Sequence, residues 1–442
     1  MKRAKLLLST VFLSVILLNT NTVYSQELLT LSDAINRGLE SSFSIQIARK
    51  STEIAHINNR LGNAGFSPRI DLNANQSNSL QNRHLEQSDN TEIDQSGYRT
   101  HSLTSGIALN WTLFDGFAMF VRADKLELFE EQSDLNLRMT IENAIADIIF
   151  TYFAISQHEK LLDWHLEQLT LSENRLSIAR EKTKIGSGSD LQTMQAELDF
   201  RTDSTLMLSQ RNLVFNLKSH LNRLLNRAPE TAFSVEQNVE KPTERTFEQI
   251  YSKMAEQNAS LLIARNQKQI RNKELEETKS QRYPTVYISG AYNFNQTGTP
   301  QGSTELSRIL GPSVGIGASL TLFNGLNTSR KIKTAHIVAE TQQLMLDELT
   351  TRLNHDAFTI VNELNQALEM VKVEEEYVNL AQRNVEIGME KYGLGAISDL
   401  ELREIQNKLS ASRNRLITAL TNAQAREIEL LVLTGDFKKY LE

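Results

Sequence analysis

Apolar residues recur at every seventh position along two long stretches of the chain. In the first stretch this spacing is kept by Ile141, Ile148, Ile155, Leu162, Leu169 and Leu176. Sustained heptads of this kind indicate helices that pack as coiled coils. No proline or glycine interrupts residues 118–184, so we expect one helix over about 117–185. At 1.5 Å per residue such a helix is about 100 Å long, more than three times the thickness of a bilayer core.

The second stretch repeats the first at an offset of 209 residues. WTLFDG at 111–116 matches LTLFNG at 320–325, and SDL at 189–191 matches SDL at 398–400. Both matches have the same offset, so nothing is inserted or deleted between them. Loops tolerate changes of length, whereas an element whose length sets a geometry does not. We therefore expect a second long helix over about 326–394, with heptad positions at Ala357, Leu364, Val371, Val378 and Val385.

Alternating segments lie between the helices and predict four strands, over about 68–80, 102–114, 284–296 and 312–323. Each has one apolar face, which in the second strand holds Leu103, Ile107, Leu109, Trp111 and Leu113. Period two with one apolar face is typical of membrane strands, although the signal of a single segment is weak. The alternation alone fits two soluble hairpins packed on helices equally well.

Shorter helices and prolines complete the plan. Pro68 and Pro284 are 216 residues apart and should each end a helix and open a strand, because proline disfavours helical backbone in the residue before it. Pro300 and Pro312 are expected in or beside the second hairpin loop. Pro229 and Pro242 lie in the predicted linker between repeats. The shorter helices are expected from Leu31 to about Asn63, Phe247 to about Glu277, Asp190 to Leu225 and Asp399 to Leu433.

Four membrane strands cannot close a barrel by themselves. Known membrane barrels have eight or more strands, and an open edge in lipid leaves backbone groups unpaired. Membrane strands in this chain would therefore require several copies, with eight strands from two copies and twelve from three. The arithmetic does not choose between them.

The N-terminus has the three parts of a secretory signal peptide. Lys2, Arg3 and Lys5 are followed by a mostly apolar run over 6–18 and by small residues around 23–25. The apolar run is too short to span a bilayer as a helix. We expect a signal peptide over 1–25, a first repeat over 26–228, a linker at the equator of the molecule over 229–246 and a second repeat over 247–442.

Composition argues against several kinds of chemistry. The chain has no cysteine and a formal charge of −7, so thiolate chemistry is absent and no nucleic-acid partner is expected. His158 and His165 are seven apart, and no H-E-x-x-H or G-x-S-x-G motif occurs. The glycines at 186 and 188 follow a helix and lack the phosphate-loop pattern, so they indicate a turn between helices. We expect no catalytic residue, no cofactor and no metal.

Several motifs resemble those of the TolC-like outer membrane efflux proteins, in the same order and with the same duplication. LTLSDAI at 29–35 is similar to the start of that family. The helix-to-strand junctions are FSPRI at 66–70 and RYPTV at 282–286, and the strand-to-helix turns are LFDG at 113–116 and LFNG at 322–325. KYGLGAISDL at 391–400 resembles the family's helix-tip motif, whereas the first tip, KTKIGSGSD at 182–190, lacks the tyrosine.

The resemblance implies a mainly α protein with a small β membrane part. Three copies would form a twelve-stranded outer-membrane barrel, continuous with an α-barrel of long helical hairpins through the periplasm. The implied partners are outer-membrane lipid, a periplasmic adaptor and an inner-membrane pump of RND or ABC type. The chain would be the duct of an efflux or secretion system and not an enzyme. The alternatives are a passive porin, which would not need helices of 100 Å, and an exported structural coiled coil, which would not need the hairpins.

The resemblance also assigns roles to individual residues. Glu401 and Glu404 lie three apart on one helix face, and their counterparts in the first repeat are the neutral Gln192 and Gln195. In similar proteins acidic residues here surround the closed periplasmic entrance, although a solvated helix face explains them equally well. The residues expected at the adaptor-binding tips are Gly186, Ser187, Gly188, Asp190, Tyr392, Gly393, Gly395, Ser398 and Asp399. Those expected to shape the strand–helix junctions are Pro68, Asp115, Gly116, Pro284, Asn324 and Gly325.

Overall fold

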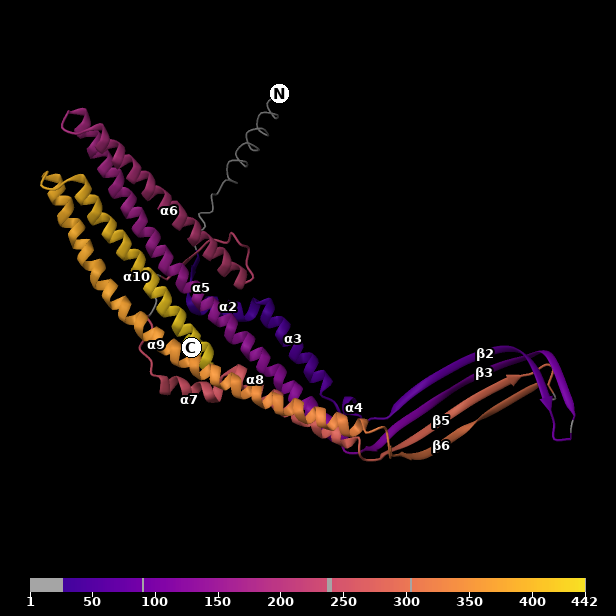
Figure 1. The fold of residues 1–442 in the computed structure, drawn as a ribbon. Coiled ribbons are helices and arrows are strands. Elements are labelled where there is room, and N and C mark those ends of the chain that lie inside the picture. The colour runs from indigo at the N-terminus through magenta and orange to yellow at the C-terminus, as the bar shows by residue number, and fades with distance from the viewer. Residues whose placement is uncertain (1–26, 90, 237–240, 303, 442) are drawn as a thin grey trace, which may run out of the picture.

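The computed structural model describes residues 27–441 except residues 90, 237–240 and 303. The signal peptide predicted over 1–25 lies outside the described residues. The molecule is elongated, with a sheet at one end and two helical hairpins at the other (Figure 1). Across the part of the chain that the structure describes, no helix is both long and apolar enough to cross a membrane.

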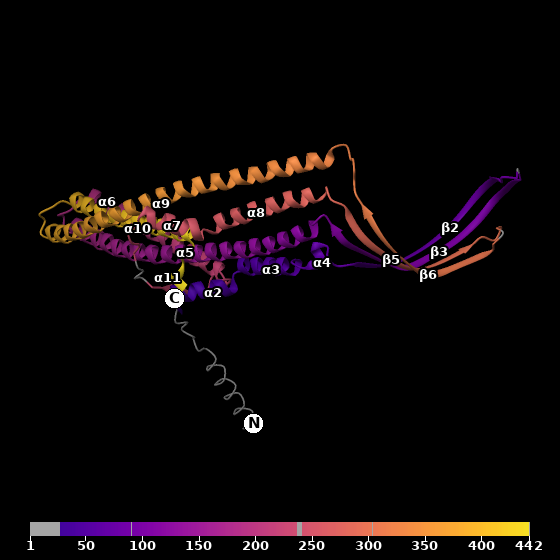
Figure 2. The same cartoon turned by 90° about the horizontal axis from the view of Figure 1, so that it is seen from below.

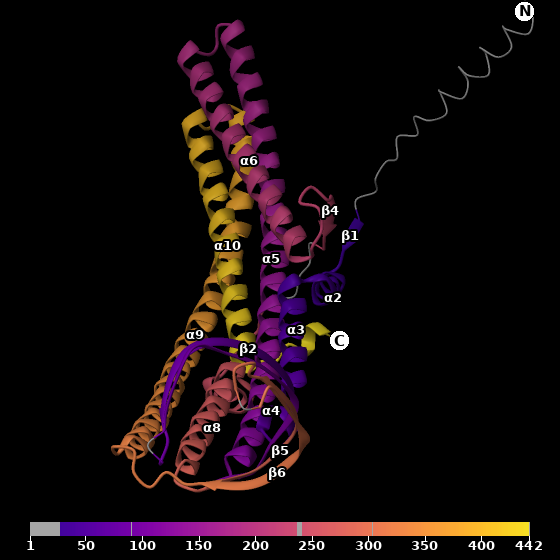
Figure 3. The same ribbon diagram turned by 90° about the vertical axis from the view of Figure 1, so that its right-hand side faces the viewer.

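Two helices of 67 residues each run through most of the helical part. They are α5 (Ala118–Lys184) and α9 (Asn327–Gly393), and both bounds lie within one residue of those that the heptads predict. Each folds back on a shorter partner, α6 (Asp190–Leu224) and α10 (Asp399–Thr434). The two hairpins lie side by side, and α10 packs against α5 (Figure 3).

The two shorter N-terminal helices of the repeats are broken, and the prediction of continuous helices over 31–63 and 247–277 is wrong. The first is divided into α2 (Leu31–Ser41), α3 (Phe43–Asn58) and α4 (Leu61–Ala64), and the second into α7 (Phe247–Gln257) and α8 (Ala259–Ser280). Ser42 and Asn258, which are 216 residues apart like Pro68 and Pro284, have extended ψ angles of 123° and 118°. The Asn258 side chain accepts from Leu261 N and donates to Leu433 O, so it starts α8 and ties it to α10.

The widest part of the molecule contains the main apolar core. Here α2, α6 and a small sheet pack on the middle of α5, and α7 and α8 pack on α9 and α10. The small sheet pairs β1 (Glu27–Leu29) in parallel with β4 (Phe233–Val235). Tyr152 on α5 is fully buried, and its hydroxyl donates to Leu29 O and accepts from Glu236 N, so the start of the chain and the segment between the repeats are joined on α5. The last described element is the short helix α11 (Lys438–Leu441).

The larger sheet is antiparallel, with strands in the order β2 (Arg69–Glu86), β3 (Glu92–Asp115), β5 (Thr285–Gly298) and β6 (Leu306–Ser319). At one end of the sheet, the helices α3, α5, α8 and α9 lie side by side in that order (Figure 2). The order matches that of the strands β2, β3, β5 and β6, so each helix lies at the end of one strand. Seen from its end, the sheet follows an arc (Figure 3). Strands β2 and β6 are the two edges of the sheet, and neither pairs on its outer side with another described strand.

The strands differ from the predicted ones at three places. Pairing of β2 with β3 continues out to Glu86 and Glu92, beyond the predicted strand ends at about 80 and 102. The last strand was predicted over 312–323 but ends at Ser319. Pro312 was expected in or beside the hairpin loop, but it lies within β6 opposite Tyr292. Proline is tolerated there because β6 is an edge strand of this sheet.

The pairing register puts the apolar residues of all four strands on one face, which we call the apolar face. Leu72 lies opposite Ile107, which lies opposite Tyr292. The other face, which we call the polar face, carries small and polar residues such as Asn73, Gly106 and Asn293 in neighbouring positions.

Candidate functional site

Both helix tips are closed by the same backbone motif. Gly186 and Gly395, which are 209 residues apart, have left-handed φ angles of +74° and +72°. After each long helix the glycine N–H and the next N–H donate back to helix carbonyls, as in Ser187 N to Lys182 O (2.9 Å) and Ala396 N to Lys391 O (2.8 Å). This is the Schellman arrangement, for which glycine is the usual residue. The tips are therefore turns between helices, as the sequence indicates.

Each helix that follows a tip begins with a capping box. Ser189 and Gln192 bond each other's backbone N–H groups at the start of α6, and Ser398 and Glu401 do the same at the start of α10. Glu401 Oε2 accepts from Ser398 N at 2.8 Å and from Ser398 Oγ at 2.9 Å, and these bonds lower the pKa of Glu401. The S-x-x-E and S-x-x-Q patterns could have predicted both boxes. Glu401 thus has a local role that Gln192 fills equally well in the first repeat.

Glu404 lies one turn further along α10 and is exposed. Its Oε1 is 2.8 Å from Nζ of Lys408, an exposed pair that contributes little to stability. In the single chain, the side chains of both glutamates are exposed to solvent. The structure does not bring either of them against a residue of the first tip.

The two tips contact each other through Lys182 and Tyr392. The Lys182 ammonium lies 4.5 Å from the centre of the Tyr392 ring, at a distance typical of a cation–π contact. Tyr392 is buried, and burial followed by the charge of Asp399 raises the pKa of its hydroxyl. The tyrosine that the first tip lacks is therefore the residue on which a lysine of the first tip packs.

A buried ionic network lies directly beside these tips and joins the two hairpins. Arg403 on α10 binds both carboxylate oxygens of Asp203 on α6, at 2.9 and 3.0 Å. Arg175 on α5 bonds to Asp199 on α6, and its Nε lies 3.5 Å from Asp399 Oδ1 on α10. Of these five residues, only Asp399 is expected from the sequence to have a role. Their partners lie on different helices, far apart along the chain, so periodicity within one helix gives no signal for them.

The network is not fully satisfied within one copy. Arg175 is only 1% exposed, and its Nε and Nη1 have no hydrogen-bond partner, nor has Nε of Arg403. Buried charges are costly unless paired, so removing one partner from such a network destabilises a protein strongly. This network joins the two hairpins directly beside the tips.

The strand–helix junctions also repeat. Asp115 Oδ1 accepts from Met119 N at 2.9 Å, and Asn324 Oδ1 accepts from Thr328 N at 3.4 Å, so both side chains cap a long helix. The glycines that follow, Gly116 and Gly325, have φ of +70° and +66°. The backbone at both glycines therefore turns just before the long helices begin. Pro68 and Pro284 directly precede β2 and β5.

The next residues, Phe117 and Leu326, are also left-handed, with φ of +70° and +62°. Two consecutive left-handed residues turn the chain sharply from strand to helix. Phe117 contacts the rings of Phe114 and Tyr283 edge to face. Leu326 is 70% exposed.

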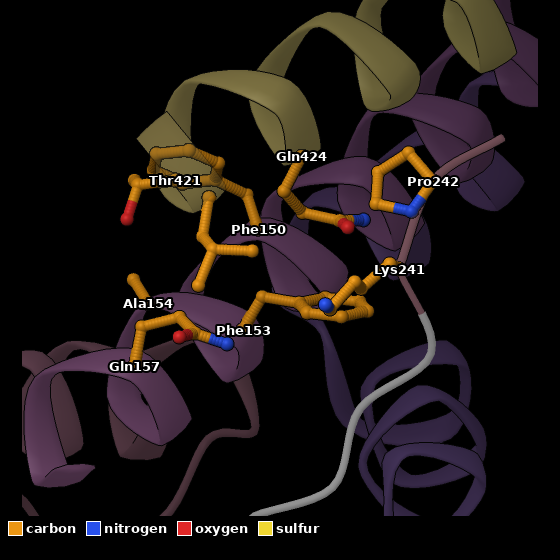
Figure 4. A pocket seen from close by; sticks show the side chains of 9 residues that line it. Phe150, Phe153, Ala154, Gln157, Lys241, Pro242, Thr421 and Gln424 are labelled. Atoms are coloured by element: carbon orange, nitrogen blue, oxygen red, sulfur yellow. The ribbon is translucent and has the colours of Figure 1, made fainter. Parts of the chain in front are cut away.

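A small apolar pocket lies between α5, α10 and the segment at Pro242 (Figure 4). Phe150, Phe153 and Leu420 line it together with the stem of Lys241. Its volume is about 20 Å³, which is room for one water molecule and not for an organic ligand. Within the described residues, no group of His, Asp or Glu is placed to hold a metal ion.

The chain matches a family model described as outer membrane efflux protein, over residues 34–225 and 250–436. It is 20% identical over 410 residues to the outer membrane efflux protein BepC of Brucella suis, covering 92% of this chain and 85% of BepC. It is 19% identical over 332 residues to the outer membrane protein TolC of Vibrio cholerae, covering 74% of this chain and 75% of TolC. The crystal structure of the outer membrane protein VceC of Vibrio cholerae has the same fold, with a TM-score of 0.73 at 16% identity over 92% of this chain and 96% of VceC.

The chain therefore belongs to the outer membrane efflux protein family. The resemblance seen in its motifs is confirmed, and so are its location in the outer membrane and its function as an efflux channel. The two matched segments lie on either side of the linker between the predicted repeats.

Proposed function

We propose that three copies of this chain form the continuous duct of a tripartite efflux or secretion system. In this arrangement a periplasmic adaptor and an inner-membrane pump of RND or ABC type meet the helix tips, and substrates leave through the barrel. The observation that carries the proposal is the single layer of four strands and four helices, which has an unpaired flank on both sides. No step of this function is catalytic.

Both flanks of the layer need a partner. Strands β2 and β6 have free edges, and an open edge in lipid leaves backbone groups unpaired. The helices at the same flanks carry exposed apolar residues, with Phe43 and Ile47 on α3 and with Ile337 and Leu344 on α9. Because the two flanks belong to opposite sides of one layer, copies would associate head to tail and close a ring.

The trimer is supported by the strand count and by the family. Four strands from each of three copies give twelve, which exceeds the smallest known membrane barrels. Native mass spectrometry of the detergent-extracted protein should give the mass of three chains. A stable monomer or dimer would rule out the twelve-stranded barrel.

We propose further that the two tips form the adaptor-binding rim. Both tips end hairpins with long helices of equal length, and an added Cβ at Gly393 or Gly395 would meet no atom within 4 Å. Gly395 has a left-handed φ, whereas Gly393 is helical, so Gly393→Trp adds bulk without backbone strain. This variant should reduce crosslinking to the adaptor while the trimer stays intact. Unchanged crosslinking together with unchanged export would contradict the docking role.

The acidic pair supports a proposal about the entrance. In a trimer, Glu401 and Glu404 would place six carboxylates around one axis, and a ring of acids favours cations in a pore. Glu401→Gln with Glu404→Gln is a clean test, because the glutamine at 192 makes the same capping box as Glu401. The doubly substituted trimer should lose cation selectivity and block by divalent cations in planar bilayers. Selectivity and block equal to those of the parent would show that both glutamates only face solvent.

A further inference from the structure

The first hairpin reaches beyond the second at the end of the sheet that is far from the helices (Figure 1). Pairing of β3 with β5 ends at His101 and Gly298, whereas pairing of β3 with β2 continues to Glu92. At this level the apolar face carries basic residues as well as apolar ones such as Leu80 and Leu306. Arg99, His101 and Arg308 lie there, and we call them the basic trio.

All three members of the basic trio belong to the apolar face by register. In β3 the apolar face carries the odd-numbered residues, and no register shift lies between 99 and 111. In β6 it carries the even-numbered residues, because Ile316 lies opposite Ile288 and Arg308 opposite Gln296. Contacts within the face agree, since His101 Nδ1 bonds Asn78 Oδ1 at 2.7 Å and Arg308 Nε donates to Gln296 Oε1 at 3.0 Å.

Within the described residues the basic trio has no counter-ion. Among the residues that the structure describes, no carboxylate forms an ion pair with Arg99, His101 or Arg308, and all three are exposed. His101 and Arg308 bond only to neutral amides, and the Arg99 side chain makes no hydrogen bond within the described chain. Strand β6 is two strands away from β3, so the trio extends over about 10 Å across the sheet and about 13 Å along it, because Arg308 is level with Leu103, four residues from Arg99.

The position of the basic trio along the strands can be compared with the extent of the apolar face. On β5 the apolar face begins at Val286 and ends at Phe294, which is about 27 Å along a strand and about 20 Å in height at the usual tilt of barrel strands. That height is close to the apolar band of an outer-membrane barrel. On β6, Arg308 lies between Leu310 and Leu306, at successive positions of the same face. The basic groups therefore lie where a lipid's headgroup would meet its acyl chains.

We propose that Arg99, His101 and Arg308 bind the phosphorylated headgroup of a glycolipid in the outer leaflet. The apolar face below them takes the acyl chains, and the two guanidinium groups and the imidazole bind phosphate. Guanidinium groups suit phosphate because they donate several hydrogen bonds in a planar fork. This inference rests on the proposed barrel, which puts the apolar face against lipid. It goes beyond the proposed function by assigning a lipid site to one level of the sheet.

The test compares lipid binding by the parent trimer and two variants in detergent, by native mass spectrometry. The probes are lipid A with its phosphates, lipid A from which the phosphates have been removed, and inorganic phosphate alone. The first variant combines Arg99→Gln, His101→Gln and Arg308→Gln. The control is Arg83→Gln, because Arg83 stacks 4.2 Å over the ring of Tyr98, an even-numbered residue of β3 and so on the polar face, at the same end of the sheet.

We expect the parent and the Arg83→Gln control to retain phosphorylated lipid A. The triple variant should bind it about 30-fold more weakly, because each surface arginine contributes about a factor of five to the affinity for an anionic lipid. Equal retention by the triple variant, or of the dephosphorylated lipid, would overturn the proposal. Inorganic phosphate that displaces the lipid at equal concentration would show a site for free phosphate and would overturn the assignment to a lipid. The same spectra report the oligomer, so a trimer without lipid refutes this site alone, whereas the absence of a trimer refutes the proposed barrel.

Discussion

Arg403 and Asp203 are 200 residues apart in the chain, and the guanidinium of one binds both carboxylate oxygens of the other at 2.9 and 3.0 Å. Arg403 belongs to the second hairpin and Asp203 to the first, so this bidentate pair fixes one hairpin on the other. Asp203 also accepts from Ser172 and Gln168 on α5, which holds its carboxylate in place. The pair is almost completely buried, with exposed fractions of 9% for Arg403 and 4% for Asp203.

The first prediction concerns the free energy that this pair contributes. Arg403→Met should destabilise the protein by about 3–5 kcal/mol, because it leaves the buried Asp203 carboxylate without its cation. Adding Asp203→Leu should recover a large part of the loss, since buried ion pairs are often replaceable by apolar residues. Urea unfolding followed by the helical circular dichroism signal measures both variants.

Comparison of the single and double variants shows whether Arg403 stabilises the hairpins by its charge or by its packing. If the double variant is as unstable as Arg403→Met, the arginine stabilises the hairpins by packing and not by its charge. A control is Arg201→Met on α6, because Arg201 is exposed and pairs only with Glu197 on its own helix. That change should alter stability by less than about 1 kcal/mol.

The pairing of Arg403 with Asp203 could not be predicted from the sequence, although the long helices could. Heptads such as Ile148 and Ile155 predicted the long helices because the period of a side-chain pattern is a property of one helix. The ends of β2 and β3 were missed because Leu85 is the only apolar residue in Gln81–Glu86, which is too few to show an alternating pattern. The partner of Arg403 is set by the packing of two hairpins, and no local pattern reports it.

The internal repeat also contains a signal for the breaks in the shorter helices. The helix breaks at Ser42 and Asn258 share the offset of 216 that Pro68 and Pro284 already showed, and both residue types favour helix caps. A comparison of the repeats for cap residues would have predicted two helices in place of one. The pattern from Ser398 to Glu401 likewise predicts a capping box before any role at an entrance.

The second prediction concerns the capping boxes at the tips. Ser398→Ala should destabilise the start of α10 by about 0.5–2 kcal/mol, because the N–H of Glu401 loses its acceptor. Hydrogen exchange should rise for the first turn of α10 and stay unchanged at its C-terminal end. Ser398→Asp is the matched control, because aspartate is a comparably good cap and should keep protection at the parent level. Equal exchange in the alanine variant would mean that the box does not hold the tip.

The third prediction uses the two strand–helix turns as a matched pair. An added Cβ at Gly116 would lie 2.5 Å from Ser280 O and 2.8 Å from Tyr283 Cβ, whereas at Gly325 the nearest atom is Asn327 Nδ2 at 3.8 Å. Both glycines are left-handed, so an alanine costs about 1–2 kcal/mol in either place from backbone strain alone. Gly116→Ala should add a clash and destabilise each single chain further. This difference is expected in the monomer, where thermal unfolding in a dissociating detergent measures it.

In the proposed trimer the two turns become equivalent. The offset of 216 relates Ser280–Tyr283 to Ala64–Ser67, and those residues of a neighbouring copy would pack against Gly325 as Ser280–Tyr283 packs against Gly116. Gly325→Ala should therefore reduce the yield of trimer severalfold while leaving the fold of the single chain nearly unchanged. A trimer yield equal to that of the parent would indicate that no neighbour packs against this turn.

The fourth prediction concerns pH. Burial lowers the pKa of both His158 and His165 below 6.5, and for His165 the nearby Arg413 lowers it further while Asp203 opposes the shift. Below about pH 6.5 the unfolded chain therefore binds more protons than the folded chain. The contribution of these histidines to the free energy of unfolding is fully present above about pH 6.5 and decreases as the pH falls toward their folded pKa values. The loss from the buried His165 is at most about 1.4 kcal/mol for each pH unit in that window, and solvent screening makes it smaller for the half-buried His158.

Urea midpoints between pH 7.5 and pH 5.5 test this expectation, because most carboxylates stay ionised over that range. The parent protein should lose stability toward pH 5.5, and His165→Gln should flatten the dependence, since glutamine does not titrate. His158→Gln should flatten it less, and the amide could still bond Gln210, whose Nε2 lies 3.1 Å from His158 Nδ1. His336→Gln is the control, because His336 is 59% exposed and pairs with Glu340, one turn away on α9. A slope that is the same in the parent and in His165→Gln would show that the pH dependence comes from other groups and that burial of this imidazole costs little.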